Sequence, residues 1–334
     1  MVKRDAAYDY IRSIAMIAIV LCHFFQIRHN YAVFSWLNIG VQVFLVLSAK
    51  LMCQKEMTTW TQVFAFYKTR LLRILLPVWI YLLCLVPVLF LAGRGPAVSA
   101  IVLYAVGLAG FAPTGVLGLG HFWYITVLLL CYLLVPLLCR IDRISNRWSA
   151  LLKAVCVILP ILVFVMTPWV YFGCNMALFI AAYFLFRPMG EDPLWSRKLT
   201  LRLLPLAVLA IGVRLYLDGL QNPNSQVYEL GSTIAKAVIG LFLFALLYLL
   251  FSCLGKTSDS RAIRMLSNTS YEVYIVHQFI LLALYEYVPF FRGEDLVNGL
   301  ALLGAALLLI TGNTAVLYFI KNKILSRLKR RTRR

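Results

Sequence analysis

Charged residues are scarce in this sequence. Only 13% of its 334 residues are Asp, Glu, Lys or Arg, whereas soluble domains average about 25%. Hydrophobic residues make up 62% of the chain and its mean hydropathy is +0.86, both too high for a water-soluble domain of ordinary size. The composition therefore excludes a soluble globular protein. It predicts an all-α integral membrane protein built from spans of about 20 apolar residues.

Acidic residues are the rarer charged class, with 13 Asp and Glu against 32 Lys and Arg, for a net charge of +19. A basic excess can indicate nucleic-acid binding, but that interpretation needs a basic face on a folded soluble domain. Most of the lysines and arginines instead fall between apolar runs, so membrane topology explains the charge and no nucleic-acid partner is predicted. The basic tail 320–334 is expected to be cytoplasmic and to contact anionic membrane lipid.

Closely paired cysteines are missing. The eight cysteines form no C-x-x-C pair, and nearly all of them lie inside apolar runs or at their ends. This spacing argues against a zinc site and against a disulfide framework. It is typical of small apolar packing residues, so neither a metal nor a disulfide is predicted.

Ten apolar runs are long enough, or nearly so, to cross a bilayer. They lie at about 11–30, 35–53, 74–92, 122–139, 154–168, 170–186, 203–217, 232–253, 268–288 and 296–319. An eleventh stretch, 98–113, is short and contains Gly107 and Gly110, so a re-entrant or interfacial segment is expected there. No connection is long enough for a soluble catalytic domain. We therefore predict a single domain over residues 1–334 with about ten transmembrane helices.

Basic residues orient the predicted helices, because short cytoplasmic loops concentrate Lys and Arg. With the N-terminus inside, the cytoplasmic segments carry most of the 32 basic residues. If 98–113 also crossed the membrane, every later basic loop would face outward. We therefore predict that both termini are cytoplasmic and that the chain is a multi-pass protein of the cell membrane, with the bacterial cytoplasmic membrane as the expected location.

The first predicted helix carries two ionisable side chains, Arg12 and His23. An ionisable group within a span costs about 2.5–3.5 kcal/mol on insertion scales, which favours a functional role. Their separation in the sequence places both on one helical face, about 16 Å apart along the axis. Arg12 is therefore predicted at the cytoplasmic entrance and His23 deeper in the membrane. The alternatives are a snorkelling anchor for Arg12 and a hydrogen-bonded core histidine for His23.

Basic and aromatic residues mark the ends of two further predicted helices. Arg70 and Arg73 lie on one face just before Pro77, and guanidinium groups bind phosphate as bidentate forks. They are predicted to bind a phosphate-bearing ligand or, alternatively, to anchor the helix on the cytoplasmic side. His121 and Trp123 mark the outer end of the fourth helix, where an aromatic belt explains the tryptophan but not the histidine.

Polar residues recur along the ninth predicted helix. Tyr271, Tyr274 and His277 follow one another at steps of three, which places two phenols and an imidazole along one side. Helix packing is the alternative explanation for the tyrosines. Glu272, at the inner end of the same helix, is expected to pair with a neighbouring arginine.

The landmarks along the chain, taken in order, resemble those of the membrane acyltransferase-3 family. They are YDYIRSIAMIAIVLCHF, GVQVFLVLSAKL, RLLRILLP, HFWYI and SYEVYIVH. The resemblance covers almost the whole chain, and the Arg-to-His spacing in the first helix is its most specific element. One departure follows the second helix, where the family has Ser-Gly and an apolar residue but this chain has Ser48, Ala49 and Lys50. The glycine that would allow close backbone approach at that bend is missing.

The resemblance implies a ten-span core that transfers an acyl group, usually acetyl, to sugar hydroxyls. It also implies that Arg12 and His23 are required for activity and that Arg70 and Arg73 are the family's paired arginines. We therefore predict an O-acetyltransferase in which His23 and Arg12 are catalytic. His23 is expected to act as the general base, with a covalent acyl-histidine relay as the variant.

The two substrates are expected to reach His23 from opposite sides of the membrane. Acetyl-CoA, the predicted donor, is cytoplasmic, and its phosphates are assigned to Arg70, Arg73 and Lys50 together with Arg12. The acceptor, a surface polysaccharide or lipid-linked glycan, is assigned to polar and aromatic residues: His121, Trp123, Tyr271, Tyr274 and His277. The alternatives are a transporter of a glycan or lipid-linked precursor, for which no repeat-related broken helices are visible, and a structural membrane partner.

Overall fold

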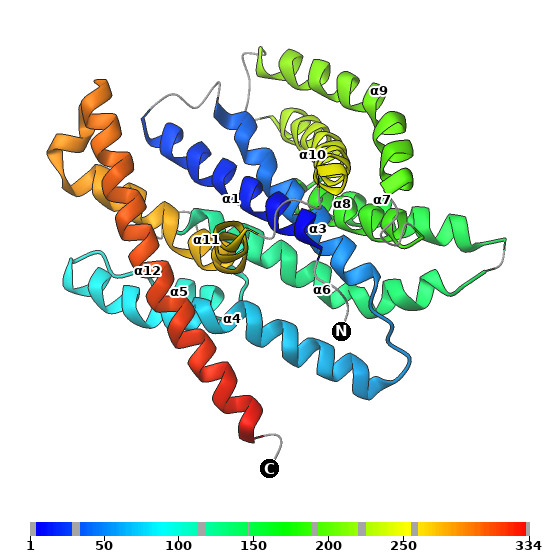
Figure 1. Ribbon diagram of the computed structural model, residues 1–334, viewed down its shortest axis with the longest axis horizontal. Helices are drawn as coiled ribbons and strands as arrows, with labels where there is room; N and C mark the ends of the chain where they lie inside the picture. The colour runs from blue at the N-terminus through cyan, green and yellow to red at the C-terminus, as the bar shows by residue number, and fades with distance from the viewer. Residues whose placement is uncertain are drawn as a thin grey trace. The chain divides into compact units, whose positions relative to one another are not determined.

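The computed structural model describes residues 5–28, 34–112, 118–145, 147–188, 193–219, 225–254 and 260–331. Every regular element in these ranges is helical, as the composition predicted. In chain order the elements are α1 (Ala6–Ile27), η1 (Ser35–Ile39), α3 (Gly40–Cys53), α4 (Trp60–Leu91), α5 (Val98–Ala105), η2 (Ala109–Phe111), η3 (Gly120–Phe122), α6 (Trp123–Asp142), α7 (Ser149–Phe164), α8 (Val170–Phe186), α9 (Pro193–Asp218), α10 (Gln226–Leu254), α11 (Arg261–Tyr287), η4 (Pro289–Arg292) and α12 (Leu296–Arg331), where η marks a 3₁₀ helix (Figure 1).

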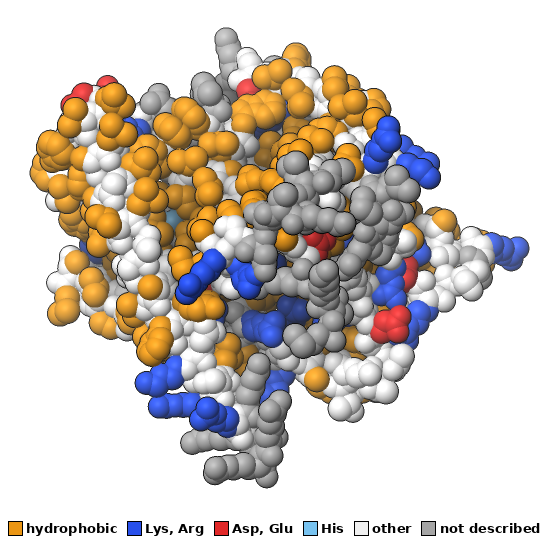
Figure 2. Space-filling model, in the orientation of Figure 1, with side chains coloured by type: hydrophobic (Ala, Val, Ile, Leu, Met, Phe, Trp, Pro, Cys, Tyr) orange, Lys and Arg blue, Asp and Glu red, His pale blue; other side chains and the backbone are white. Residues whose placement is uncertain are grey.

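Each of the ten predicted apolar runs overlaps a described helix, but several helices are longer than their runs. α4 and α9 begin well before their apolar segments, and α12 continues through most of the predicted basic tail to Arg331. An apolar run measures the part of a helix that faces hydrocarbon, whereas backbone hydrogen bonding continues into the polar region beyond it. Along α12, hydrophobic side chains cover the first part, and Lys and Arg side chains gather near its C-terminal end (Figure 2).

The chain is a multi-pass membrane protein. Among the described residues, seven helices are long and apolar enough to cross a bilayer, namely α1, α3 with η1, α4, α6 with η3, α9, α10 and α12. α7 and α8 are apolar but shorter, with 16 and 17 residues. α11 is long enough, with 27 residues, but carries too many polar side chains to qualify. The count of about ten spans and the cytoplasmic termini stay predictions.

The segment expected to be re-entrant or interfacial contains only short helices, and its last residue lies outside the described ranges. α5 has eight residues, or about 12 Å of helix, against a hydrocarbon core of about 30 Å. Thr126 of α6 holds the turn after α5, because its hydroxyl donates to the carbonyl of Gly107 (3.0 Å) and accepts from the amide of Gly110 (2.9 Å). Burial raises the pKa of Tyr104 to about 12, so its hydroxyl stays protonated and donates to the Leu119 carbonyl (3.3 Å).

The described residues form two compact units. Unit 1 contains Met1–Ala18, Asn38–Phe64 and Leu130–Ser267, and unit 2 contains Ile19–Leu37, Ala65–Leu129 and Asn268–Arg334. Four long helices, α1, α4, α6 and α11, contribute residues to both units. The single domain over residues 1–334 stays a prediction.

Unit 1 is organised around α8 and α10. α3, α7 and α10 all pack against α8, and α9 packs against α10. Gly173 of α8 permits close approach to α7, because a Cβ atom at this position would lie 2.4 Å from the Pro160 carbonyl oxygen. The amide of Gln42 donates to Asn175 Oδ1 (3.1 Å), which joins α3 to α8 by a buried polar contact. Figure 1 shows α9 as a bent helix, and Pro205 inside it removes one helical hydrogen bond.

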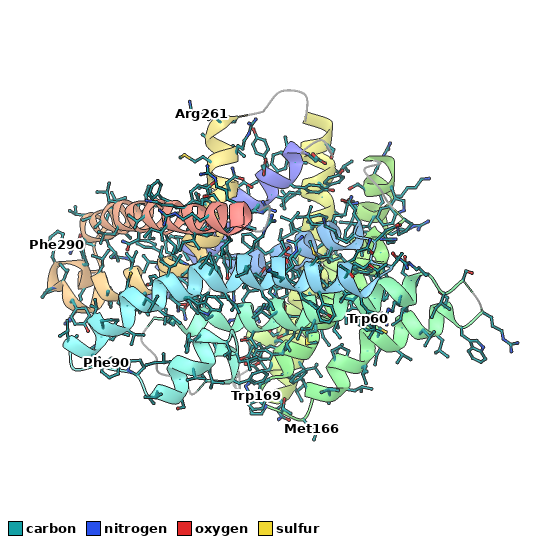
Figure 3. All side chains as sticks on the ribbon, turned by 90° about the horizontal axis from the view of Figure 1, so that it is seen from below. Trp60, Phe90, Met166, Trp169, Arg261 and Phe290 are labelled. Atoms are coloured by element: carbon teal, nitrogen blue, oxygen red, sulfur yellow. The ribbon has the colours of Figure 1, made fainter. Side chains whose placement is uncertain are left out.

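Unit 2 contains most of α4, all of α5 and α12, and most of α11. Exposed aromatic side chains mark two of its turns, Phe90 near the end of α4 and Phe290 in η4 (Figure 3). Exposed rings at helix ends are typical of membrane–water interfaces. Arg28 joins the end of α1 to the connection before α12, donating to the carbonyls of Gly293 (3.1 Å), Glu294 (2.9 Å) and Asp295 (3.1 Å).

Candidate active site

Three histidines lie together in unit 2. His23 comes from α1, His121 from η3 and His277 from α11. The ring centroid of His277 is 5.2 Å from that of His23 and 4.8 Å from that of His121, and the His23 and His121 centroids are 6.3 Å apart. The histidine cluster, as we call these three residues, therefore unites the predicted base with two residues that the sequence analysis assigned to the acceptor.

The backbone around η3 explains how His121 reaches α11. Gly118 has a φ of +66°, which L side chains rarely adopt, and a Cβ atom there would lie 2.7 Å from the Cα atom of Phe279. The His121 amide donates to Gln278 Oε1 (3.1 Å), and the Tyr274 hydroxyl donates to the His121 carbonyl. Glycine at position 118 and two hydrogen bonds thus fasten η3 against α11.

Hydrogen bonds fix the proton positions of two of the histidines. His23 Nδ1 lies 2.9 Å from Gln26 Oε1, so Nδ1 donates and Nε2 keeps the lone pair that a general base needs. His277 Nδ1 donates to the Tyr274 carbonyl (2.8 Å), which likewise leaves a lone pair on Nε2. The sequence analysis missed Gln26. Its spacing of three from His23, on the same helical face, was the signal available.

Three ring nitrogens of the histidine cluster are buried and have no hydrogen-bond partner among the described residues. His277 is completely buried and His121 is 4% exposed, while His23 is partly buried. Within the described residues, Nε2 of His277 and both ring nitrogens of His121 have no hydrogen-bond partner. A buried polar atom left unpaired costs about 1–3 kcal/mol. The arrangement therefore suits a polar ligand that supplies the missing hydrogen bonds.

The aromatic residues assigned to the acceptor separate into two groups. The Tyr274 ring is 5.0 Å from His121 and 5.7 Å from His277 between centroids, so Tyr274 belongs beside the histidine cluster. Tyr271 instead contacts α4, where its hydroxyl donates to the Ile74 carbonyl (3.0 Å). Trp123 is partly buried at the start of α6, with its ring 6.4 Å from that of Tyr124.

The paired arginines lie on α4 in unit 2. Arg73 is exposed and Arg70 is partly buried, with its guanidinium 5.8 Å from the centroid of the Phe66 ring. Because Tyr271 bonds to Ile74, the residue after Arg73, the part of α11 around Tyr271 lies beside this stretch of α4. An exposed guanidinium on a helix fixed in this way has the access that phosphate binding requires.

Arg12 and Lys50 belong to unit 1. The Arg12 guanidinium donates to the Ser267 hydroxyl (3.2 Å), which donates in turn to Asp9 Oδ1 (2.6 Å). Lys50 is completely buried. Ser48–Lys50, where the family has a Ser-Gly pair, lie within α3, which continues to Cys53. Alanine in place of glycine favours helix at this point.

Glu272 pairs with a lysine rather than with the arginine that the sequence analysis expected. Its carboxylate accepts a hydrogen bond from Lys321 of α12, and the Lys321 ammonium lies 4.8 Å from the centroid of the Tyr318 ring. Glu272 is completely buried. The sequence could not identify this partner, because residues 272 and 321 are 49 positions apart and only the packing of α11 against α12 brings them together.

The described part of the chain contains no group of three His, Cys, Asp or Glu side chains with the geometry of a metal site.

A comparison with protein families matches residues 5–319 to one family model, described as an acyltransferase domain. The match includes all three histidines and both paired arginines. No curated protein and no solved structure matches the chain.

Proposed function

Because the chain belongs to the acyltransferase-3 family, and is thus a membrane acyltransferase, we propose that it O-acetylates sugars. The donor is cytoplasmic acetyl-CoA, and the acceptor is a hydroxyl of a surface polysaccharide or a lipid-linked glycan at the bacterial cytoplasmic membrane. The observation that carries this proposal is the histidine cluster, in which His23 offers an unprotonated Nε2 beside buried ring nitrogens that have no hydrogen-bond partner among the described residues.

His23 acts as the general base. A sugar hydroxyl is a poor nucleophile at neutral pH, and a histidine can remove its proton as attack proceeds. The acceptor oxygen bonds to the acetyl carbon, the carbon–sulfur bond of the thioester breaks, and the proton held on Nε2 passes to the departing CoA thiolate. Gln26 supports this role, because its Oε1 atom holds the Nδ1 proton and turns Nε2 toward the reaction.

The donor enters from the cytoplasmic side. Arg70 and Arg73 bind its phosphates, while the thin pantetheine arm extends into the membrane toward His23. The charged nucleotide part thus stays in water and keeps its hydration, so no free energy is lost in desolvating its phosphates. Arg12 and Lys50 are proposed as further cations for the donor on the strength of the sequence pattern.

Loss of either paired arginine is expected to weaken donor binding more than catalysis. Arg70→Ala or Arg73→Ala should raise KM for acetyl-CoA while kcat changes little, because removal of an interaction made equally in ground and transition states has this signature. Steady-state release of CoA measures both constants. Arg94→Ala, which removes a basic residue paired with Glu286 elsewhere in unit 2, is the control. An unchanged KM would leave both arginines as topological anchors.

The acceptor arrives from the outer side. On an ideal helix His23 lies about 16 Å deeper in the membrane than Arg12. His121 in η3 and Trp123 at the start of α6 lie at the proposed outer end of that transmembrane helix. We therefore propose that the acceptor contacts His121, Trp123, Tyr274 and His277. Tyr271, closer to the cytoplasmic end of α11 than Tyr274 and His277, is proposed to contact it as well.

Oriented proteoliposomes test the whole proposal. Labelled acetyl-CoA is supplied on the cytoplasmic face and glycan only on the other face, and label is expected in glycan ester. Transfer only when both substrates share the cytoplasmic face would refute the cross-membrane arrangement. Glycan movement without ester would favour the transporter alternative, to which the family match gives no support.

A further inference from the structure

The ring nitrogens of His277 take no part in the chemical step of the proposed reaction. Its Nδ1 proton is committed to the Tyr274 carbonyl, so Nε2 can only accept a hydrogen bond while the ring is neutral. That nitrogen is buried and has no partner within the described residues. Within the described part of the chain, the ring nitrogens of His121 also have no hydrogen-bond partner, so the two imidazoles do not bond to one another although their centroids are 4.8 Å apart.

We propose that His277 Nε2 accepts a hydrogen bond from a second hydroxyl of the acceptor, adjacent to the one that is acetylated. The acceptor class is therefore a vicinal diol, and His277 determines specificity for it. This inference rests on the proposed function, because it assumes that His23 acts on an acceptor hydroxyl.

One hydroxyl cannot satisfy both histidines. A hydroxyl has a single proton, and the reacting hydroxyl gives that proton to His23 Nε2. His277 needs another donor, and its ring centroid is 5.2 Å from that of His23. Adjacent carbons of a sugar ring carry hydroxyls side by side, so the neighbour of the reacting hydroxyl is the donor closest at hand.

The second hydroxyl keeps its proton throughout the reaction. Only the first hydroxyl loses its proton, to His23 and then to the CoA thiolate, as one carbon–oxygen bond forms and one carbon–sulfur bond breaks. The hydrogen bond to His277 therefore orients the acceptor without entering the chemistry. A site built to bond a hydroxyl rejects an analogue that lacks it, because the buried partner is left unpaired.

Two simple alcohols test the inference. Purified protein in lipid receives acetyl-CoA with either trans-cyclohexane-1,2-diol or cyclohexanol at equal concentration, and mass spectrometry measures the ester formed. The wild-type protein is expected to acetylate the diol at least about 10-fold faster than the mono-alcohol. His277→Phe, which keeps a ring but removes the acceptor nitrogen, should abolish this preference. His277→Gln restores an acceptor oxygen and should recover part of it.

Tyr104→Phe removes a buried hydroxyl whose hydrogen bond goes to the Leu119 carbonyl rather than to a histidine of the cluster, and should keep the preference. Equal rates with the two alcohols in the wild-type protein would overturn the inference, as would a preference that survives His277→Phe. Absence of transfer to the diol would overturn it as well. Hydrolysis of acetyl-CoA by the same sample would then tell whether the proposed transferase activity itself has failed.

Discussion

His23→Ala is expected to lower acetyl transfer by about 10²–10⁴-fold, the range that general-base catalysis contributes. The methyl side chain of alanine cannot take the hydroxyl proton, and no other ring in the cluster shares the Gln26 contact that orients Nε2. Labelled ester formed in lipid vesicles measures the rate. Expression and membrane insertion should be unchanged, because His23 is only partly buried and makes its one described hydrogen bond within α1.

Variants of Gln26 test whether His23 acts as a general base or only packs in the core. Gln26→Glu keeps an oxygen that accepts the Nδ1 proton and should retain substantial activity, whereas Gln26→Leu should lower kcat with little change in the KM for acetyl-CoA. Gln26 is exposed, so neither substitution disturbs the core. Near-normal turnover in His23→Ala would show that His23 is a structural core histidine and would refute the proposed general-base mechanism.

Lys321→Met is expected to destabilise the protein by about 3–5 kcal/mol, the usual cost of leaving one member of a buried ion pair unpaired. Glu272 is completely buried and the Lys321 side chain is 14% exposed, so water cannot replace the lost ammonium. The second carboxylate oxygen, Oε2, already lacks a partner within the described residues. Denaturant titration of the purified protein in detergent measures the loss.

The double variant Glu272→Gln with Lys321→Met is the matched control. It removes both charges, and replacing a buried pair with neutral groups is often close to neutral for stability. The double variant should therefore recover most of the stability lost in Lys321→Met. Equal destabilisation by the single and double variants would mean that packing of the Lys321 stem, rather than its charge, holds α12 against α11.

The apolar length of a segment is a local property, and it predicted the helical architecture. Each of the ten predicted apolar runs overlaps a described helix, because a backbone in an apolar environment has to satisfy its own hydrogen bonds. The stretch 98–113 was expected to be too short to cross the membrane, because it is short and contains glycines. Its helix α5 has only eight residues. The family also followed from the sequence, because ordered landmarks such as the Arg12-to-His23 spacing depend on chain order alone, and the family match confirms it.

The site depends on contacts between residues that the chain order leaves far apart. His23, His121 and His277 were each identified in the sequence, but only helix packing brings their rings within 4.8–6.3 Å. Proton positions on His23 and His277 follow from Gln26 and a backbone carbonyl. The spacing of Gln26 from His23 was a signal in the sequence, but only the structure shows which atoms meet. Lys321 pairs with Glu272 for the same reason: several cations of suitable charge exist, and the tertiary structure alone selects the one that shares a buried space with the carboxylate.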